Sequence, residues 1–138
     1  MKKLLVGCFL LAVIVGCSQA AQLSVLGGVR DGLAVGVIAD QGIAHNLGLR
    51  YGVEADTGSQ PIVAFLGGKF YLTNVGRSMP LSLGLGAVAY VGNGKTNAGL
   101  SLSVIIERAF NLPQLFIETG VDACDQGRFQ LQLGYKID

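Results

Sequence analysis

The sequence predicts an all-β fold, a single eight-stranded antiparallel up-and-down transmembrane β-barrel. Apolar residues alternate with small or polar ones along eight segments, and turn residues separate those segments. Beyond position 22, no stretch of about 11 residues keeps the helical period. The length of 138 residues suits one domain. The charged fraction of 14% is below the roughly 25% of ordinary soluble domains, so disorder driven by charge is excluded.

The first segment has the layout of a secretory signal peptide, which we assign to residues 1–20. Lys2 and Lys3 precede an apolar stretch from Leu4 to Val15, too short for the about 20 residues that span a bilayer. Removing Lys2 and Lys3 lowers the 10 Lys and Arg to eight, against 9 Asp and Glu. This balance leaves no basic surface for phosphates, so we expect no nucleic-acid partner.

Two cleavage sites fit this segment, and both stay open. Ser18-Gln19-Ala20 has small residues where signal peptidase requires them and would release a chain starting at Ala21. The run from Ile14 to Cys17 resembles a bacterial lipobox, which would place a lipid on Cys17. Either way Cys124 is the only thiol in the body of the chain, so we expect neither an internal disulfide nor a cysteine metal site.

Residues 21–138 form the predicted barrel domain. We expect its first hairpin at 23–29 and 33–39, and six further strands at 46–55, 62–72, 81–91, 99–107, 115–123 and 129–137. The last strand is the clearest, with Phe129, Leu131, Leu133, Tyr135 and Ile137 on one face and Arg128, Gln130, Gln132, Gly134 and Lys136 on the other. The strand at 62–72 is the least clear, and we assign to its outward face Ile62, Ala64, Leu66, Phe70 and Leu72.

Turn residues separate the predicted strands throughout. Gly, Pro, Asn or Asp, which supply a positive φ or a preset turn, occur at 30–32, 40–42, 56–59, 74–80, 93–95, 111–113 and 125–127. Consecutive hairpins of this kind indicate an up-and-down meander.

The composition of the two strand faces indicates which one is outside. A soluble sandwich would expose a face rich in charge, whereas here the second face is mostly Gly and Ser with isolated charges of both signs. In a transmembrane barrel the apolar face meets lipid, and the small and charged residues fill the lumen. We therefore predict a paired lumenal charge network of Arg50, Glu54, Lys69, Glu107, Glu118, Asp122 and Lys136.

The length of the strands supports the membrane prediction, whereas the small number of aromatic residues does not. Most of the strands reach the roughly 9–11 residues that a tilted spanning strand needs. Tyr51, Phe70, Phe129 and Tyr135 supply parts of two aromatic belts, but the chain has no Trp. A soluble or lipid-anchored periplasmic barrel is the alternative.

The sequence resembles the small bacterial outer-membrane β-barrels, a family that includes the membrane domain of outer membrane protein A and the opacity-like barrels. The resemblance lies in the signal peptide, the glycine-rich segment 80–87 and the end hairpin of 115–122 and 128–137. It implies an outer-membrane location and recognition by the barrel assembly machinery. The chain departs from the family by ending in Ile137-Asp138, where these barrels usually end in an aromatic residue.

Residues that could support catalysis are few. His45 is the only histidine and adjoins a predicted turn without a Ser or Cys motif. Glu118 and Asp122 lie four residues apart on one strand, about 13 Å at a rise of about 3.3 Å per residue, too far to act on one bond. Cys124 lies between acidic residues, which does not favour a thiolate. We therefore expect no enzyme, no cofactor and no metal.

The function that these features predict is an integral outer-membrane protein with a structural or surface role and a lumen largely filled by side chains. Eight strands leave an interior just wide enough for side chains to fill. We expect a monomer whose partners are outer-membrane lipid and, during biogenesis, the assembly machinery. A narrow pore or a small-ligand-binding barrel is the alternative function.

Overall fold

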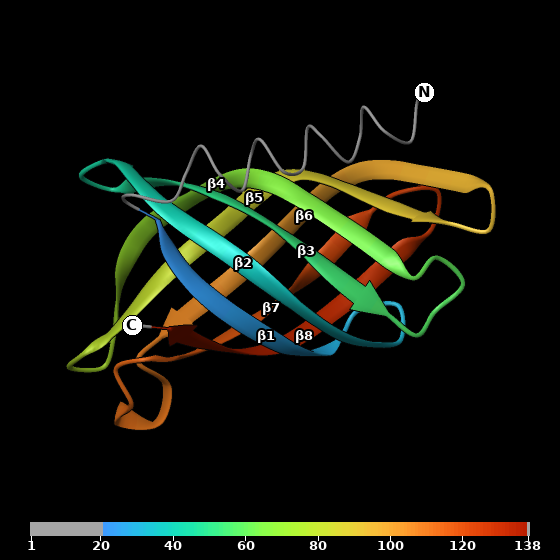
Figure 1. Ribbon diagram of the computed structural model, residues 1–138. Coiled ribbons are helices and arrows are strands. Elements are labelled where there is room, and N and C mark those ends of the chain that lie inside the picture. Colours follow the sequence, from blue (N-terminus) through green and yellow to red (C-terminus); the bar gives the residue numbers. More distant parts are fainter. Residues whose placement is uncertain (1–20, 138) are drawn as a thin grey trace.

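The computed structural model describes residues 21–137, which form a closed barrel of eight antiparallel strands (Figure 1). Each strand pairs with its neighbours in sequence, and the first closes the barrel against the last. The predicted all-β up-and-down barrel is therefore confirmed. The strands are β1 (Gln22–Val29), β2 (Leu33–Ala44), β3 (Leu47–Asp56), β4 (Ile62–Val75), β5 (Met79–Gly92), β6 (Lys95–Glu107), β7 (Leu115–Ala123) and β8 (Gly127–Ile137). The signal peptide assigned to residues 1–20, with Cys17, lies outside the described residues.

The predicted turn at residues 40–42 is wrong. β2 continues through them to Ala44 and pairs Asp40 with Arg50 of β3, and the chain reverses at 45–46. An irregularity in the β2–β3 register between Gly42 and Ala44 accommodates this extension. Asp40 resembles a turn residue in the sequence because acidic residues occur both in turns and in the barrel interior, where Asp40 pairs with Arg50.

Other strands also run further than the sequence predicts. β4 reaches Val75 and β5 begins at Met79, so the predicted turn at 74–80 narrows to residues 76–78. β6 begins at Lys95 and pairs with β5 down to Gly92, directly after the turn at 93–94. Polar residues at strand ends thus extend the ladder instead of breaking it.

The connections between strands define the two ends of the barrel. The terminal end carries the start of β1 and the end of β8, which pair through Leu23 and Ile137, together with the connections at 45–46, 76–78 and 108–114. The distal end carries the connections at 30–32, 57–61, 93–94 and 124–126. Among residues 21–137, no helix is long and apolar enough to cross a membrane.

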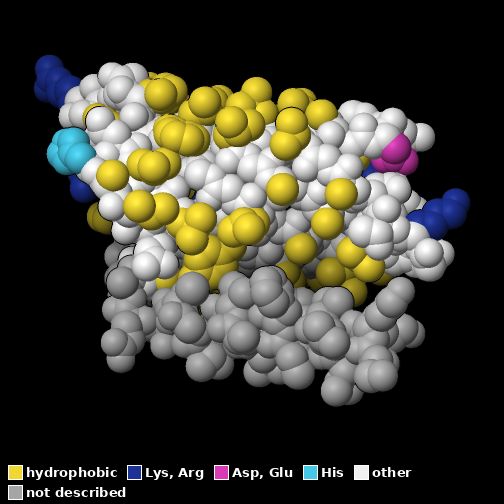
Figure 2. Space-filling model, turned by 90° about the horizontal axis from the view of Figure 1, so that it is seen from above, with side chains coloured by type: hydrophobic (Ala, Val, Ile, Leu, Met, Phe, Trp, Pro, Cys, Tyr) yellow, Lys and Arg dark blue, Asp and Glu magenta, His cyan; other side chains and the backbone are white. Residues whose placement is uncertain are grey.

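The outward face of the barrel is apolar on every strand. Its exposed side chains include Leu23, Val37, Val53, Leu66, Leu85, Leu102, Val121 and Leu131. Figure 2 shows hydrophobic side chains over the middle of the barrel and charged side chains at its two ends. The charged side chains of the strand interiors point inward, so the distribution of apolar and charged residues is the reverse of that in a soluble barrel.

The interior holds an apolar core that the sequence analysis does not predict. One buried cluster consists of Leu26, Ile38, Ile105 and Phe116, with Phe65 packed against it. A second cluster consists of Val63, Val88 and Tyr90, and Phe65 also contacts it. The lumen therefore contains apolar side chains as well as the Gly, Ser and charged residues predicted for it.

Candidate functional site

The charged residues inside the barrel form two groups. The distal group, near the distal end, consists of Arg30, Glu54, Tyr90, Asp122 and Gln132. The terminal group, near the terminal end, consists of Asp40, Arg50, Lys69, Glu107, Glu118 and Lys136. Glu118 and Gln132 are cross-strand neighbours in the β7–β8 ladder, so the two groups adjoin.

Arg30 is the centre of the distal group. It directly follows β1, its side chain turns into the barrel, and it is 5% exposed. Its guanidinium pairs with Glu54 of β3 and, at 2.8 Å, with Asp122 of β7. Its Nε also donates to the hydroxyl of Tyr90 on β5 at 3.2 Å, and that hydroxyl in turn donates to Asp122. One cation thus holds two buried carboxylates.

The surroundings of Arg30 favour its charged form. Burial alone would lower the pKa of the guanidinium, but the hydrogen bond to Asp122 and the charge of Glu54 outweigh burial and raise the pKa above its ordinary value. The nearby Cys124 follows the end of β7, and burial together with the charge of Asp122 raises the pKa of its thiol. Cys124 therefore stays a thiol at neutral pH, the weakly nucleophilic form.

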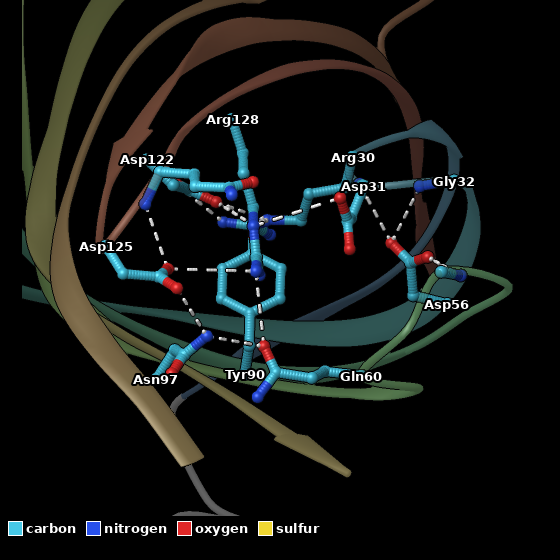
Figure 3. Close-up of polar contacts among 12 residues, drawn as sticks. Arg30, Asp31, Gly32, Asp56, Gln60, Tyr90, Asn97, Asp122, Asp125 and Arg128 are labelled. Carbon is cyan, nitrogen blue, oxygen red and sulfur yellow. Dashed lines mark hydrogen bonds and ion pairs between the residues drawn. The ribbon is translucent and has the colours of Figure 1, made fainter. Parts of the chain in front are cut away.

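Polar side chains at the distal rim surround this group (Figure 3). Arg128 stacks over the ring of Tyr90, with its guanidinium carbon 3.9 Å from the ring centroid, and donates to Gln60 at 3.2 Å. Asn97 donates to Gln60 and to Asp125, at 3.0 Å each. These contacts tie the distal connections to the barrel interior.

Asp56 organises the first distal turn. Its carboxylate accepts from the backbone N–H groups of Asp31 at 3.0 Å, Gly32 at 3.3 Å and Gly58 at 2.6 Å. A carboxylate that bonds backbone donors in this way fixes the two turns that meet beside it. Asp56, at the end of β3, therefore holds the turn from which the Arg30 side chain enters the lumen.

The terminal group balances three acidic residues with three basic ones. Glu107 accepts from Lys69 at 2.5 Å and from Lys136 at 3.0 Å. Arg50, which is fully buried, lies 2.8 Å from Glu118 and 3.3 Å from Asp40. The Arg50 guanidinium carbon also lies 5.5 Å from the ring centroid of Phe116.

Two of these contacts cross the barrel between opposite strands. Arg30, at the end of β1, reaches Tyr90 on β5, and Arg50 on β3 reaches Glu118 on β7. In a closed ring of eight strands, each pair joins elements that are four strands apart. The two contacts therefore span the lumen at two levels.

All seven predicted network residues lie on the inward face and have partners there: Arg50, Glu54, Lys69, Glu107, Glu118, Asp122 and Lys136. The sequence analysis omits Arg30 and Asp40 from this network, since it assigns both to turns. Strand parity could have found them, because Arg30 continues the inward series of Leu26 and Gly28, and Asp40 continues that of Ile38.

The candidate metal-ligating residues are not grouped together in the part of the chain that the structure describes. Among residues 21–137, no three His, Cys, Asp or Glu side chains are placed to hold a metal ion. His45 lies in the terminal-end turn and is exposed. Glu118 and Asp122 belong to different groups, since Glu118 pairs with Arg50 and Asp122 with Arg30.

Comparison with known proteins supports the architecture. No family model and no curated protein matches the chain. Among solved structures, the N-terminal β-barrel domain of Pseudomonas aeruginosa OprF is similar, with a TM-score of 0.56 and 10% sequence identity. The match covers 85% of this chain and 96% of that domain. The two chains therefore share a barrel fold across almost the whole of the OprF domain.

Proposed function

We propose that this chain is an integral outer-membrane protein that serves a structural or surface role and has no catalytic activity. The observation that carries the proposal is the apolar outward face, which surrounds a closed barrel whose paired charges lie inside. A closed barrel leaves no unpaired sheet edge in lipid, where each unsatisfied backbone group costs several kcal/mol. The predicted export signal and the fold shared with the OprF domain support the same proposal.

The proposal includes the partners of the barrel. Outer-membrane lipid covers the exposed Leu and Val side chains, the assembly machinery inserts the chain, and the inserted barrel is a monomer. The proposal does not depend on which cleavage site is used, at Ala20 or before Cys17, because both predict export.

Replacing Leu131 with Arg is expected to block insertion into lipid. Leu131 lies on the outward face of β8 and is 49% exposed, and a cation at the bilayer midplane costs about 2–4 kcal/mol. Refolding into phosphatidylcholine vesicles would be followed by carbonate extraction and by the migration of unheated and boiled samples on a gel. The unchanged chain should resist extraction and show a heat-dependent band, and Leu131→Arg should lose both properties.

Gln126→Arg is the matched control for that variant, because Gln126 is exposed in a distal connection and an added cation there stays in water. It should refold like the unchanged chain. If Leu131→Arg and Gln126→Arg refold equally well, or if the unchanged chain is extracted by carbonate, the membrane proposal is wrong.

We also propose that side chains close the lumen to ions. A closed lumen is expected of a structural barrel, and an open one of a narrow pore. The two contacts across the lumen, Arg30 to Tyr90 and Arg50 to Glu118, support closure together with the apolar clusters around Phe65. The expected result in a planar bilayer is that the inserted protein gives no stable conductance steps. Regular steps from the unchanged chain would instead favour the pore.

A further inference from the structure

The connection between β6 and β7 differs from the others at its end of the barrel. It spans residues 108–114, whereas the other two terminal-end connections span 45–46 and 76–78. Its backbone takes left-handed φ values at Arg108 (54°), Phe110 (55°) and Asn111 (61°), a conformation that side chains other than Gly adopt at a cost. Figure 1 shows this orange segment bending away from the barrel between β6 and β7.

That backbone presents apolar side chains to the surroundings. Phe110 is 74% exposed and Leu112 is 52% exposed. Leu72 and Val75, near the end of β4 at the same end of the barrel, are also exposed. The strained connection thus exposes a large aromatic side chain, where a polar side chain would cost less free energy in water. Aromatic residues at the interface are typical of membrane boundaries.

A hollow lined by both polar and apolar groups lies beside these apolar side chains. It has a volume of about 440 Å³ and is lined by Ser78, Arg108, Asn111 and Pro113, so it joins the β4–β5 turn to the β6–β7 connection. Arg108 is exposed and has no ion pair with any residue in the described range 21–137. A guanidinium, a hydroxyl and an amide are hydrogen-bond donors suited to phosphate oxygens.

We propose that this hollow binds the phosphate of a glycerophospholipid in the leaflet at the terminal end, while Phe110 and Leu112 enter the adjoining acyl-chain boundary. This inference rests on the proposed membrane location. It commits to a lipid phosphate and not to free phosphate, because the apolar side chains beside the hollow match acyl chains. The connection then anchors the barrel at a fixed depth and compensates for the sparse aromatic belt.

The absence of Trp from the chain makes a direct test possible, since an introduced Trp is the only one present. Phe110→Trp would be refolded into phosphatidylglycerol and phosphatidylcholine vesicles with bromine either near the headgroup or deep in the acyl chains. We expect blue-shifted emission that is quenched most by the shallow bromines. Emission at the wavelength of Trp in water, without quenching, would overturn the inference.

The contribution of Arg108 is measured in the same background. Adding Arg108→Gln to Phe110→Trp should shift the emission to the red and reduce the shallow quenching, whereas Lys95→Gln, at an exposed site beside a distal turn, should leave both unchanged. Inorganic phosphate in the buffer should not reproduce the effect of Arg108→Gln. Quenching that is insensitive to Arg108→Gln, or that free phosphate abolishes, would overturn the lipid-phosphate site.

A second Trp position separates this inference from the proposal that it rests on. Leu131→Trp, on the outward face of β8, should be quenched by deep bromines. If Leu131→Trp is quenched and Phe110→Trp is not, the barrel is in lipid, and the inference that the β6–β7 connection anchors it is wrong. If neither is quenched, the membrane location itself is wrong.

Discussion

Replacing Arg30 with Ala is expected to lower the free energy of unfolding by about 3–5 kcal/mol, the range for breaking a buried ion pair by removing one partner. The guanidinium is the cation paired with both Glu54 and Asp122, which are 5% and 0% exposed. Without it, two carboxylates stay buried close together, and the remaining donors include the hydroxyls of Tyr90 and Ser101 and the amide of Gln132. Urea unfolding of the protein folded in lipid vesicles measures the change.

Two comparisons test whether the lower free energy of unfolding comes from the buried carboxylates that no longer have a cation beside them. Lys95→Ala removes a cation from an exposed position, and we expect a change within about 0.5 kcal/mol. Adding Glu54→Gln and Asp122→Asn to Arg30→Ala should recover part of the stability, because both buried negative charges are then gone. If Arg30→Ala costs no more than Lys95→Ala, Arg30 does not hold the distal group together.

Most of the fold could be predicted from the sequence because a strand buries one face and the side-chain period is two. A slip of one residue exchanges the faces, so the alternation in β8, with Leu131 outward and Gln132 inward, excludes a one-residue slip in its pairing with β1 and β7. The same parity places Arg50, Glu54 and Glu118 on the inward face. Parity gives the face of a residue but not its partner.

The errors occur where a strand meets a turn. Asp40 and Asn74 are polar residues that lie inside β2 and β4 close to turn residues, and in a soluble β-protein such residues end a strand. Inside a narrow barrel the same residue types face the lumen, so composition does not distinguish a turn from an inward position. Arg30, the central residue of the distal group, does lie in the predicted turn at 30–32, but its side chain enters the lumen, which a turn assignment alone does not predict.

The apolar lumen core was missed for a different reason. Phe65 lies on a strand that is apolar on both faces, where alternation carries no signal, and Phe116 was not assigned to either face. Their packing depends on residues of other strands that face them inside the barrel. Phe116 faces Gly134 across the β7–β8 ladder and lies near Arg50. Such complementarity between residues far apart in the chain becomes visible only when the barrel closes.

Phe116→Ala is expected to lower the free energy of unfolding by about 3–5 kcal/mol, the usual cost of removing a buried Phe. The ring is 1% exposed, packs with Leu26, Ile38 and Ile105, and covers Gly134. A glycine covered by an aromatic ring on the neighbouring strand is a stabilising pair in β-sheets. Urea unfolding in vesicles measures the loss, with Phe129→Ala on the outward face of β8 as the control that should cost less.

The pairing of Phe116 with Gly134 makes the two substitutions strongly non-additive. A Cβ at position 134 would overlap the Phe116 ring, so Gly134→Ala alone should cost about 1–3 kcal/mol through overpacking. In the Phe116→Ala background the ring is gone and the added methyl partly fills its space, so Gly134→Ala should become neutral or stabilising. This reversal of sign identifies direct contact in a double-mutant cycle. Additive losses from the two variants would show that the ring does not lie on Gly134, and that the lumen is packed in another way.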